Sequence, residues 1–209
     1  KKLLQGALKR RQDTPEIGVI NEKNRDETTE LFPPLHEEFS SIHVSGAARV
    51  DGRALRDSLI RAAKKNGATL INGDAHLLFH QNRVTGVKIA NQDIPADAVI
   101  VCAGAWANQL LQPLGVNFQV HFQKAQIVHL SLPNADTNQW PVLMPPGNQY
   151  ILAFDDGRVV AGATHEDTEE FDTRITAGGL QEVLNKMLET APGLANGTFV
   201  EARTGFRPF

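Results

Sequence analysis

The sequence lacks several features that would assign a chemistry at once. It has one cysteine, Cys102, so an intrachain disulfide and a cysteine-based zinc site are both excluded. The formal net charge of -3 gives no electrostatic reason to expect a nucleic acid as a partner. No apolar run approaches the roughly 18 residues that span a bilayer, and no signal-peptide block follows the basic N-terminus. We therefore expect a cytoplasmic protein without an integral membrane segment.

Sequence motifs that mark common active sites are also missing. There is no G-x-G-x-x-G and no G-x-x-x-x-G-K-[ST], so the chain carries no dinucleotide or P-loop fingerprint of its own. The absence of G-x-S-x-G excludes a nucleophile elbow. We expect no metal site, and the chemistry must lie in shorter local features.

The central part of the chain has the pattern of an α/β segment. Asp51 is typical of a helix N-cap, and Asn66-Gly67 tolerate the left-handed turn that ends a helix. The unbroken apolar run 98–102 is typical of a strand buried on both faces of a parallel sheet. The helix is expected to bury a stripe formed by Leu55, Leu59, Ile60 and Ala63. Further short strands are predicted at 69–71, 77–80 and 84–89.

The second half of the chain has a different pattern. Strands are predicted at 126–130, 149–154, 158–163 and 198–203, and Asp155-Asp156-Gly157 indicates a hairpin between the middle two. A helical stripe lies between them and the last strand, at Leu180, Val183, Leu184, Met187 and Leu188. We therefore predict an α+β fold, with an antiparallel sheet and helices in residues 1–47 and 112–209 and an inserted α/β segment in residues 48–111.

The first candidate site is the turn Ala103-Gly104-Ala105-Trp106, which follows the apolar run. Small residues at the carboxyl end of such a strand let a ligand approach the backbone closely. A tightly packed turn between a strand and a helix explains the same residues without any ligand.

Three further candidates lie in the second half. Tyr150 is the only tyrosine and is a candidate for binding a ligand, although a phenol at such a position is usually a core or rim residue with its hydroxyl at the edge. His165 stands beside Glu166 and Asp167, a set that can transfer protons but that also suits a solvated loop. Arg207, between Phe206 and Pro208, can present a guanidinium to a carboxylate, or form a surface salt bridge.

Four stretches, taken in order, resemble landmarks of the D-amino acid oxidase-like flavoenzymes, a group that includes glycine oxidase, sarcosine oxidase and D-amino acid dehydrogenase. The resemblance is carried by VDGRALRDSLIRAAKKNGA (50–68), ADAVIVCAGAWANQLL (96–111), RVVAGATHED (158–167) and RTGFRPF (203–209). It implies that residues 48–111 belong to an FAD-binding domain. Residues 1–47 and 112–209 would then be two parts of a substrate domain, truncated at its C-terminal end. The family's N-terminal dinucleotide motif has no counterpart here.

The resemblance also implies roles for individual residues. Arg207 occupies the position of the family's substrate-carboxylate arginine, and Tyr150 that of a tyrosine hydroxyl near the same carboxylate. The turn Ala103, Gly104, Ala105 and Trp106 would lie against FAD, and His165 would fall near the substrate cavity. The segment 122–126 replaces a family segment beside the flavin, with Ala125 where glycine is usual.

The function implied by the resemblance is FAD-dependent oxidation of the C–N bond of a D-amino acid, glycine or an N-methylglycine-like amine, by hydride transfer to flavin. The partner would be a small-molecule substrate, and self-association and the electron acceptor stay open. Because the dinucleotide motif is missing, we expect this chain alone to be inactive and to hold less than one equivalent of FAD. The alternative is a non-catalytic ligand-binding or assembly domain with the same fold.

Overall fold

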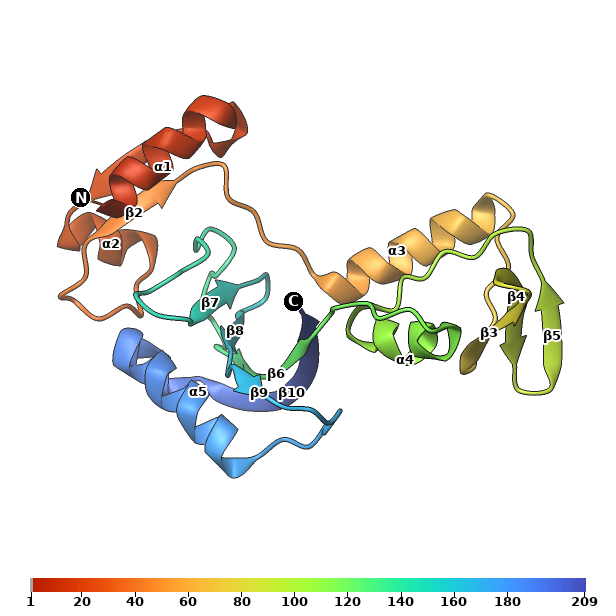
Figure 1. Ribbon diagram of the computed structural model, residues 1–209. Coiled ribbons are helices and arrows are strands. Elements are labelled where there is room, and N and C mark those ends of the chain that lie inside the picture. The colour runs from red at the N-terminus through yellow and green to blue at the C-terminus, as the bar shows by residue number, and fades with distance from the viewer. Residues whose placement is uncertain (1) are drawn as a thin grey trace. The chain divides into compact units, whose positions relative to one another are not determined.

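The structure is a computed structural model that describes residues 2–209, and the chain divides into two compact units. The first unit contains the residues up to Arg49 together with Lys124–Glu166 and Asp172–Gly205. The second unit contains Val50–Gln123, Asp167–Phe171 and Phe206–Phe209. Strands β6 (Phe122–Ser131), β9 (Glu166–Asp167) and β10 (Thr198–Pro208) therefore contribute residues to both units (Figure 1).

The first unit combines helices with two sheets. Its elements, besides most of β6 and β10, are α1 (Lys2–Asp13), η1 (Pro15–Ile17), β1 (Ile20–Lys23), α2 (Arg25–Leu31), β2 (Ser41–Val44), β7 (Tyr150–Ala153), β8 (Arg158–Gly162), α5 (Ala177–Thr190) and η4 (Pro192–Asn196). Strands β1 and β2 pair antiparallel as a two-stranded sheet. Five strands form the larger sheet in the order β10-β6-β8-β7, with β9 paired to β6.

The hairpin between β7 and β8 confirms the prediction made from Asp155-Asp156-Gly157. The two strands pair antiparallel, with Tyr150 opposite Gly162. Asp156 and Gly157 adopt positive φ angles of 62° and 71°, the left-handed backbone that two-residue hairpin turns require. A Cβ on residue 157 would lie 2.2 Å from the Leu132 carbonyl oxygen, so only glycine fits this turn.

The hydrophobic core lies in the first unit, between the five-stranded sheet and helix α5. Phe32 is 1% exposed, and its ring centroid lies 4.9 Å from that of Trp140. From the helix, Val183 and Met187 of the predicted apolar stripe are buried, which confirms that face of the helix. The other buried members of the core are Leu35, Val128, Leu130, Ile151, Ala153, Val159, Ala161, Ala191 and Leu194.

The second unit is built around one long helix and a three-stranded sheet. Its elements are α3 (Gly52–Lys65), β3 (Ala75–His80), β4 (Arg83–Ile89), β5 (Gln92–Pro95), η2 (Gly104–Trp106), α4 (Ala107–Leu111) and η3 (Gln112–Leu114). The sheet order is β3-β4-β5, and both pairings are antiparallel. The predicted strands 77–80 and 84–89 are confirmed as β3 and β4, joined through Gln81 and Asn82 at positive φ. The pattern analysis missed β5.

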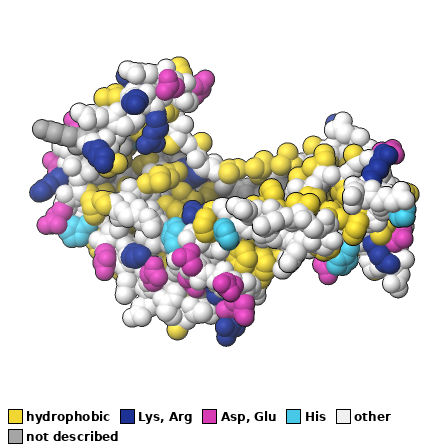
Figure 2. Space-filling view, viewed as in Figure 1, with side chains coloured by type: hydrophobic (Ala, Val, Ile, Leu, Met, Phe, Trp, Pro, Cys, Tyr) yellow, Lys and Arg dark blue, Asp and Glu magenta, His cyan; other side chains and the backbone are white. Residues whose placement is uncertain are grey.

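Helix α3 forms as predicted, but its apolar stripe is not buried. The Asp51 carboxylate accepts hydrogen bonds from the backbone N–H groups of Arg53 and Ala54, both at 3.0 Å. Leu55 and Leu59 are 46% and 61% exposed, and hydrophobic side chains gather along α3 in Figure 2. None of the residues of α3 is fully buried, so local capping, rather than burial of the stripe, accounts for the ends of the helix.

Two predicted strands are wrong for the described chain. Residues 69–71 and 98–102 are irregular, and Ile100 in the second stretch is 87% exposed. A strand exists only when neighbouring backbone satisfies its N–H and C=O groups, and the described residues offer these two stretches no such partner. The apolar composition was read correctly, but apolar composition alone does not make a strand.

Replacing the buried phenylalanine tests the core. We expect Phe32→Ala to lower the free energy of unfolding by about 3–5 kcal/mol, because it removes a buried aromatic ring and leaves a cavity beside Trp140. Urea denaturation followed by far-ultraviolet circular dichroism measures the change. The matched control is Phe118→Ala, at a ring that is 45% exposed. Equal losses in the two variants would contradict the placement of the core.

Candidate functional site

The small-residue turn in the second unit projects a glycine into open space. Gly104 has a φ of +51°, and a Cβ built on it would have only Pro208 Cγ, at 4.0 Å, within van der Waals range. Ala105 behind it is buried, whereas Trp106 is 45% exposed. The turn thus has a packed inner side and a bare outer backbone that a ligand could approach closely.

Four aromatic rings hold this turn to the end of β10. Trp106 stacks on Phe171 with centroids 4.9 Å apart, and Phe122 stacks on the same ring at 4.1 Å. Phe206 meets the other three rings edge-on, at centroid distances between 5.0 and 5.9 Å. Such offset and edge-to-face packing is the favourable geometry for aromatic side chains. Because Phe206 precedes Arg207, the cluster fixes the backbone from which the predicted carboxylate anchor extends.

The Arg207 side chain is exposed and makes one hydrogen bond to the residues that the structure describes. Its Nη2 donates to Gln123 Oε1 at 3.1 Å, and Gln123 Nε2 donates in turn to Asp167 Oδ1 at 2.8 Å. In the second unit the structure therefore brings the turn and Arg207 together through Pro208 and the aromatic cluster. The turn and Arg207 were predicted from the sequence as site residues, but the hydrogen bond between Arg207 and Gln123, 84 positions apart, was not.

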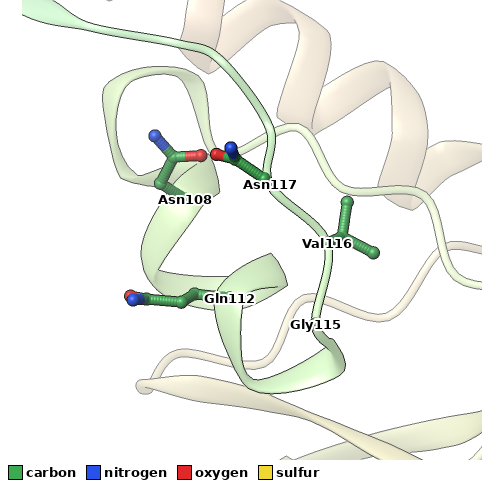
Figure 3. Close-up of a pocket in the computed structure, with 5 residues that line it drawn as sticks. All are labelled: Asn108, Gln112, Gly115, Val116 and Asn117. Carbon is green, nitrogen blue, oxygen red and sulfur yellow. The ribbon is translucent and has the colours of Figure 1, made fainter.

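Two surface hollows also lie in the second unit. One, of about 490 Å³, is lined by Phe122 and Asp167 among others and is bordered by His121 and Glu169. The other, of about 340 Å³, lies between α4 and the segment after η3 (Figure 3). In that view the amides of Asn108 and Asn117 point toward each other and Gln112 points away. The second hollow has no charged group in its lining, so it offers no anchor for an ionic substrate.

Tyr150 lies in the first unit, at the start of β7. Its side chain is half-buried, and burial raises the pKa of the phenol, so it stays protonated at neutral pH. The hydroxyl would be 3.0 Å from a Cβ on Gly162, the residue opposite in the hairpin. Among the described residues the hydroxyl has no hydrogen-bond partner. A protonated phenol of this kind is able to donate a hydrogen bond to a ligand.

The His165 loop does not assemble a proton-transfer group. Thr164 is buried and donates to Glu166 Oε1 at 2.5 Å, and Gln126 Nε2 donates to the same oxygen at 2.7 Å. Asp167 instead accepts from Gln123, and His165 is exposed. Glu166 and Asp167 therefore bond to different partners, and His165 shares neither of them.

Two buried polar residues of β6 organise the loop that follows; the sequence placed both in the segment expected beside the flavin but predicted no partner for either. Gln126 is 1% exposed; its amide oxygen accepts from the Thr176 backbone N–H at 2.8 Å, and its Nε2 donates to Thr176 Oγ1 at 3.0 Å. Lys124 is 3% exposed and its Nζ lies 3.3 Å from Asp172 Oδ2. Burying such groups is tolerated because each has a partner.

Asp172 is held ionised by its neighbours. Arg174 donates to it from Nε at 2.8 Å and from its backbone N–H at 3.0 Å, and these bonds, the side-chain ones first, hold the pKa of the carboxyl well below its usual value. Lys124 acts in the same direction. The carboxylate therefore remains a fixed counter-charge for the buried ammonium at any neutral or mildly acidic pH.

Within residues 2–209, no group of three or more His, Cys, Asp or Glu side chains is arranged to hold a metal ion. Over the same residues, no helix is both long and apolar enough to cross a bilayer.

The sequence is similar to known flavoenzymes over nearly its whole length. It matches the family model for FAD-dependent oxidoreductases over residues 3–209. It is 58% identical over 209 residues to YurR, an uncharacterized oxidoreductase of Bacillus subtilis (strain 168), covering 100% of this chain and 56% of that protein. It is 31% identical over 128 residues to a glycine oxidase of Pseudomonas putida, covering 61% of this chain and 34% of that protein.

A solved structure extends the similarity to three dimensions. The crystal structure of iminodiacetate oxidase from Chelativorans sp. BNC1 matches with a TM-score of 0.92 and 48% identity, covering 96% of this chain and 55% of that one. The match confirms the predicted α+β fold class. The chain spans about half the length, or less, of each of these three proteins.

Adding a methyl group at Gly162 tests how closely the Tyr150 ring packs on the opposite strand of the hairpin. Gly162→Ala would place its Cβ 2.5 Å from Ile127 Cγ2 and 3.0 Å from the Tyr150 hydroxyl, so we expect a loss of about 1–3 kcal/mol in the free energy of unfolding. Thermal or denaturant unfolding measures it. Gly178→Ala is the control, because a Cβ there meets nothing within 4 Å and alanine favours the helix. An unchanged stability for Gly162→Ala would contradict the close approach of Tyr150.

Proposed function

The chain belongs to the family of FAD-dependent oxidoreductases, and from this we propose that the whole protein oxidises the C–N bond of a small amino acid or secondary amine bearing a carboxylate. The observation that carries the proposal is Arg207, an exposed guanidinium fixed beside an open glycine turn. The names of the glycine oxidase and iminodiacetate oxidase relatives support this substrate class, because both compounds contain a glycine unit, free in glycine and substituted on nitrogen in iminodiacetate.

FAD is the cofactor of this family, and the turn Ala103–Trp106 fits a place beside it. A Cβ at Gly104 would enter open space, and the bare backbone there can accept the close approach of a flat group. We assign Ala103, Gly104, Ala105 and Trp106 to the wall of the cofactor site. When bound, the flavin supplies the two-electron oxidation. The proposed division is that residues 48–111 serve the cofactor and the flanking parts serve the substrate.

Arg207 would bind the substrate carboxylate. A guanidinium presents paired N–H donors in the geometry of a carboxylate, and the resulting charge-assisted bonds are stronger than neutral ones. The Trp106 and Phe206 rings next to it form an apolar surface that keeps water away from the bound substrate. Binding at Arg207 thus fixes one end of the molecule, and the amine and α-carbon extend from that fixed point.

We also propose that the Tyr150 hydroxyl donates a hydrogen bond to the substrate. Its raised pKa keeps the phenol as a donor through neutral and mildly alkaline pH. We also propose that His165, whose exposed imidazole is held by no ion pair among the described residues, lines the substrate cavity. No side chain is assigned as a dedicated base, because a neutral amine can lose a hydride from the α-carbon directly. The imine that results is hydrolysed to an oxo acid and ammonia, or to an aldehyde and an amine.

A substrate panel on the full-length protein tests the proposal. We expect a flavin absorbance spectrum and release of peroxide with one or more of iminodiacetate, glycine, N-methylglycine and the D-amino acids. An artificial dye assayed in parallel shows whether oxygen or another acceptor takes the electrons. A full-length protein that binds flavin but turns over none of these compounds would contradict the substrate class. One that binds no flavin would favour a non-catalytic domain of the same fold.

Variants of the anchor separate carboxylate binding from folding. We expect Arg207→Ala to lower kcat/KM by about 10- to 100-fold, mainly through KM, because the hydrogen bonds to a charged group are lost. Arg207→Lys should recover only part of this, since an ammonium lacks the paired donors. The control is Arg83→Ala, at the exposed first residue of β4. The anchor role is wrong if Arg207→Ala and Arg83→Ala have the same KM as the wild type.

A further inference from the structure

Gln123 lies between two opposite charges in the second unit. Its Oε1 accepts from Arg207 Nη2 at 3.1 Å, and its Nε2 donates to Asp167 Oδ1 at 2.8 Å. We infer that Gln123 is a positioning residue that orients Arg207 for the substrate carboxylate and keeps Asp167 from neutralising it. The inference rests on the proposed function, in which Arg207 is the anchor.

The orientation of the Gln123 amide is fixed by its partners. An arginine has donors only, and a carboxylate at neutral pH has acceptors only. The oxygen of the amide must therefore face Arg207 and the nitrogen must face Asp167, and the reverse placement would break both bonds. This removes the ambiguity that usually attends an amide side chain. Gln123 is thereby held at its far end by an ionised group.

The backbone under these three residues is also held. Gln123 lies in β6 and Asp167 in β9, which pair with each other, and Arg207 lies near the end of β10, which also pairs with β6. Phe122 and Phe206, the residues before Gln123 and Arg207, belong to the same aromatic cluster, with centroids 5.7 Å apart. The long, exposed arginine side chain therefore gains a fixed contact from a half-buried neighbour whose own position is set.

The neutral amide leaves the charge of Arg207 available. Among the described residues no carboxylate lies within ion-pair distance of the guanidinium, although Asp167 is only one side chain away. A guanidinium has five N–H donors, so the one bond to Gln123 leaves a complete pair of parallel donors for a carboxylate. A glutamate in place of Gln123 would occupy the same space and would compete with the substrate for the guanidinium.

Two near-isosteric substitutions in the full-length, flavin-loaded protein separate these effects. Gln123→Met removes both hydrogen bonds without adding charge, and we expect the Kd of acetate and the KM of the substrate to rise about threefold. Gln123→Glu keeps an acceptor toward Arg207 but adds a competing charge, and we expect a rise of about tenfold in both constants. In each variant kcat should change little. The acetate Kd comes from calorimetric titration and the KM from steady-state turnover.

The matched controls are Gln92→Met and Gln92→Glu, the same changes at an exposed glutamine of β5 in the same unit. They should leave the acetate Kd and the KM unchanged. The inference predicts that the acetate Kd increases from wild type to Gln123→Met to Gln123→Glu. A purely structural role for Gln123 predicts instead a lower unfolding temperature in both variants without this order of Kd values. Finding that pattern, or wild-type Kd values in both Gln123 variants, overturns the inference.

The readouts distinguish failure of the inference from failure of the proposed function. If the wild type binds acetate but oxidises no amine, the proposed reaction is wrong, and the ordering of acetate Kd values still decides the role of Gln123. If the wild type binds no acetate, Arg207 is not a carboxylate anchor and the inference is overturned with it.

Discussion

The buried polar groups of strand β6 are the constraint on which much of the structure depends. Lys124 and Gln126 are almost completely excluded from water, and each must therefore find partners within the chain. They find them in the segment that leaves the hairpin, where Asp172 pairs with Lys124, and Glu166 and Thr176 bond to Gln126. The polar loop between Glu166 and Thr176 is thus held in place by its bonds to the two buried side chains of β6. The same loop carries Asp167, the residue that fixes Gln123.

How far the fold was predictable depends on whether its determinants are local. The ends of α3 follow from Asp51 and Asn66, and the β7–β8 turn follows from the left-handed backbone at Asp156 and Gly157. These signals act over a few residues and were interpreted correctly. The stretch 98–102 was predicted as a strand from its apolar composition, but pairing is a property of neighbours, and the described residues supply none.

The candidate site divides in the same way. Arg207, Tyr150 and the Ala103–Trp106 turn were found because short motifs resemble a family, and their roles remain proposals. Gln123, Lys124 and Gln126 were predicted only as part of a segment beside the flavin, and their partners were not predicted. Their partners lie 38 to 84 positions away along the chain, and the residues between leave no periodic pattern that points to the contact. The signal that the sequence offers is a single polar residue within an apolar strand, and such a residue does not indicate which distant residue will be its hydrogen-bond partner.

The two tryptophans occupy different kinds of surroundings in different units. Trp140 packs against the buried Phe32 in the first unit, whereas Trp106 is 45% exposed on the aromatic cluster of the second. A half-buried indole packed against a core ring and an indole that is largely open to solvent emit at different wavelengths. The intrinsic fluorescence of this protein therefore contains two separable reporters. With either tryptophan replaced by phenylalanine, the melting of one unit can be followed without any label while the other unit remains silent.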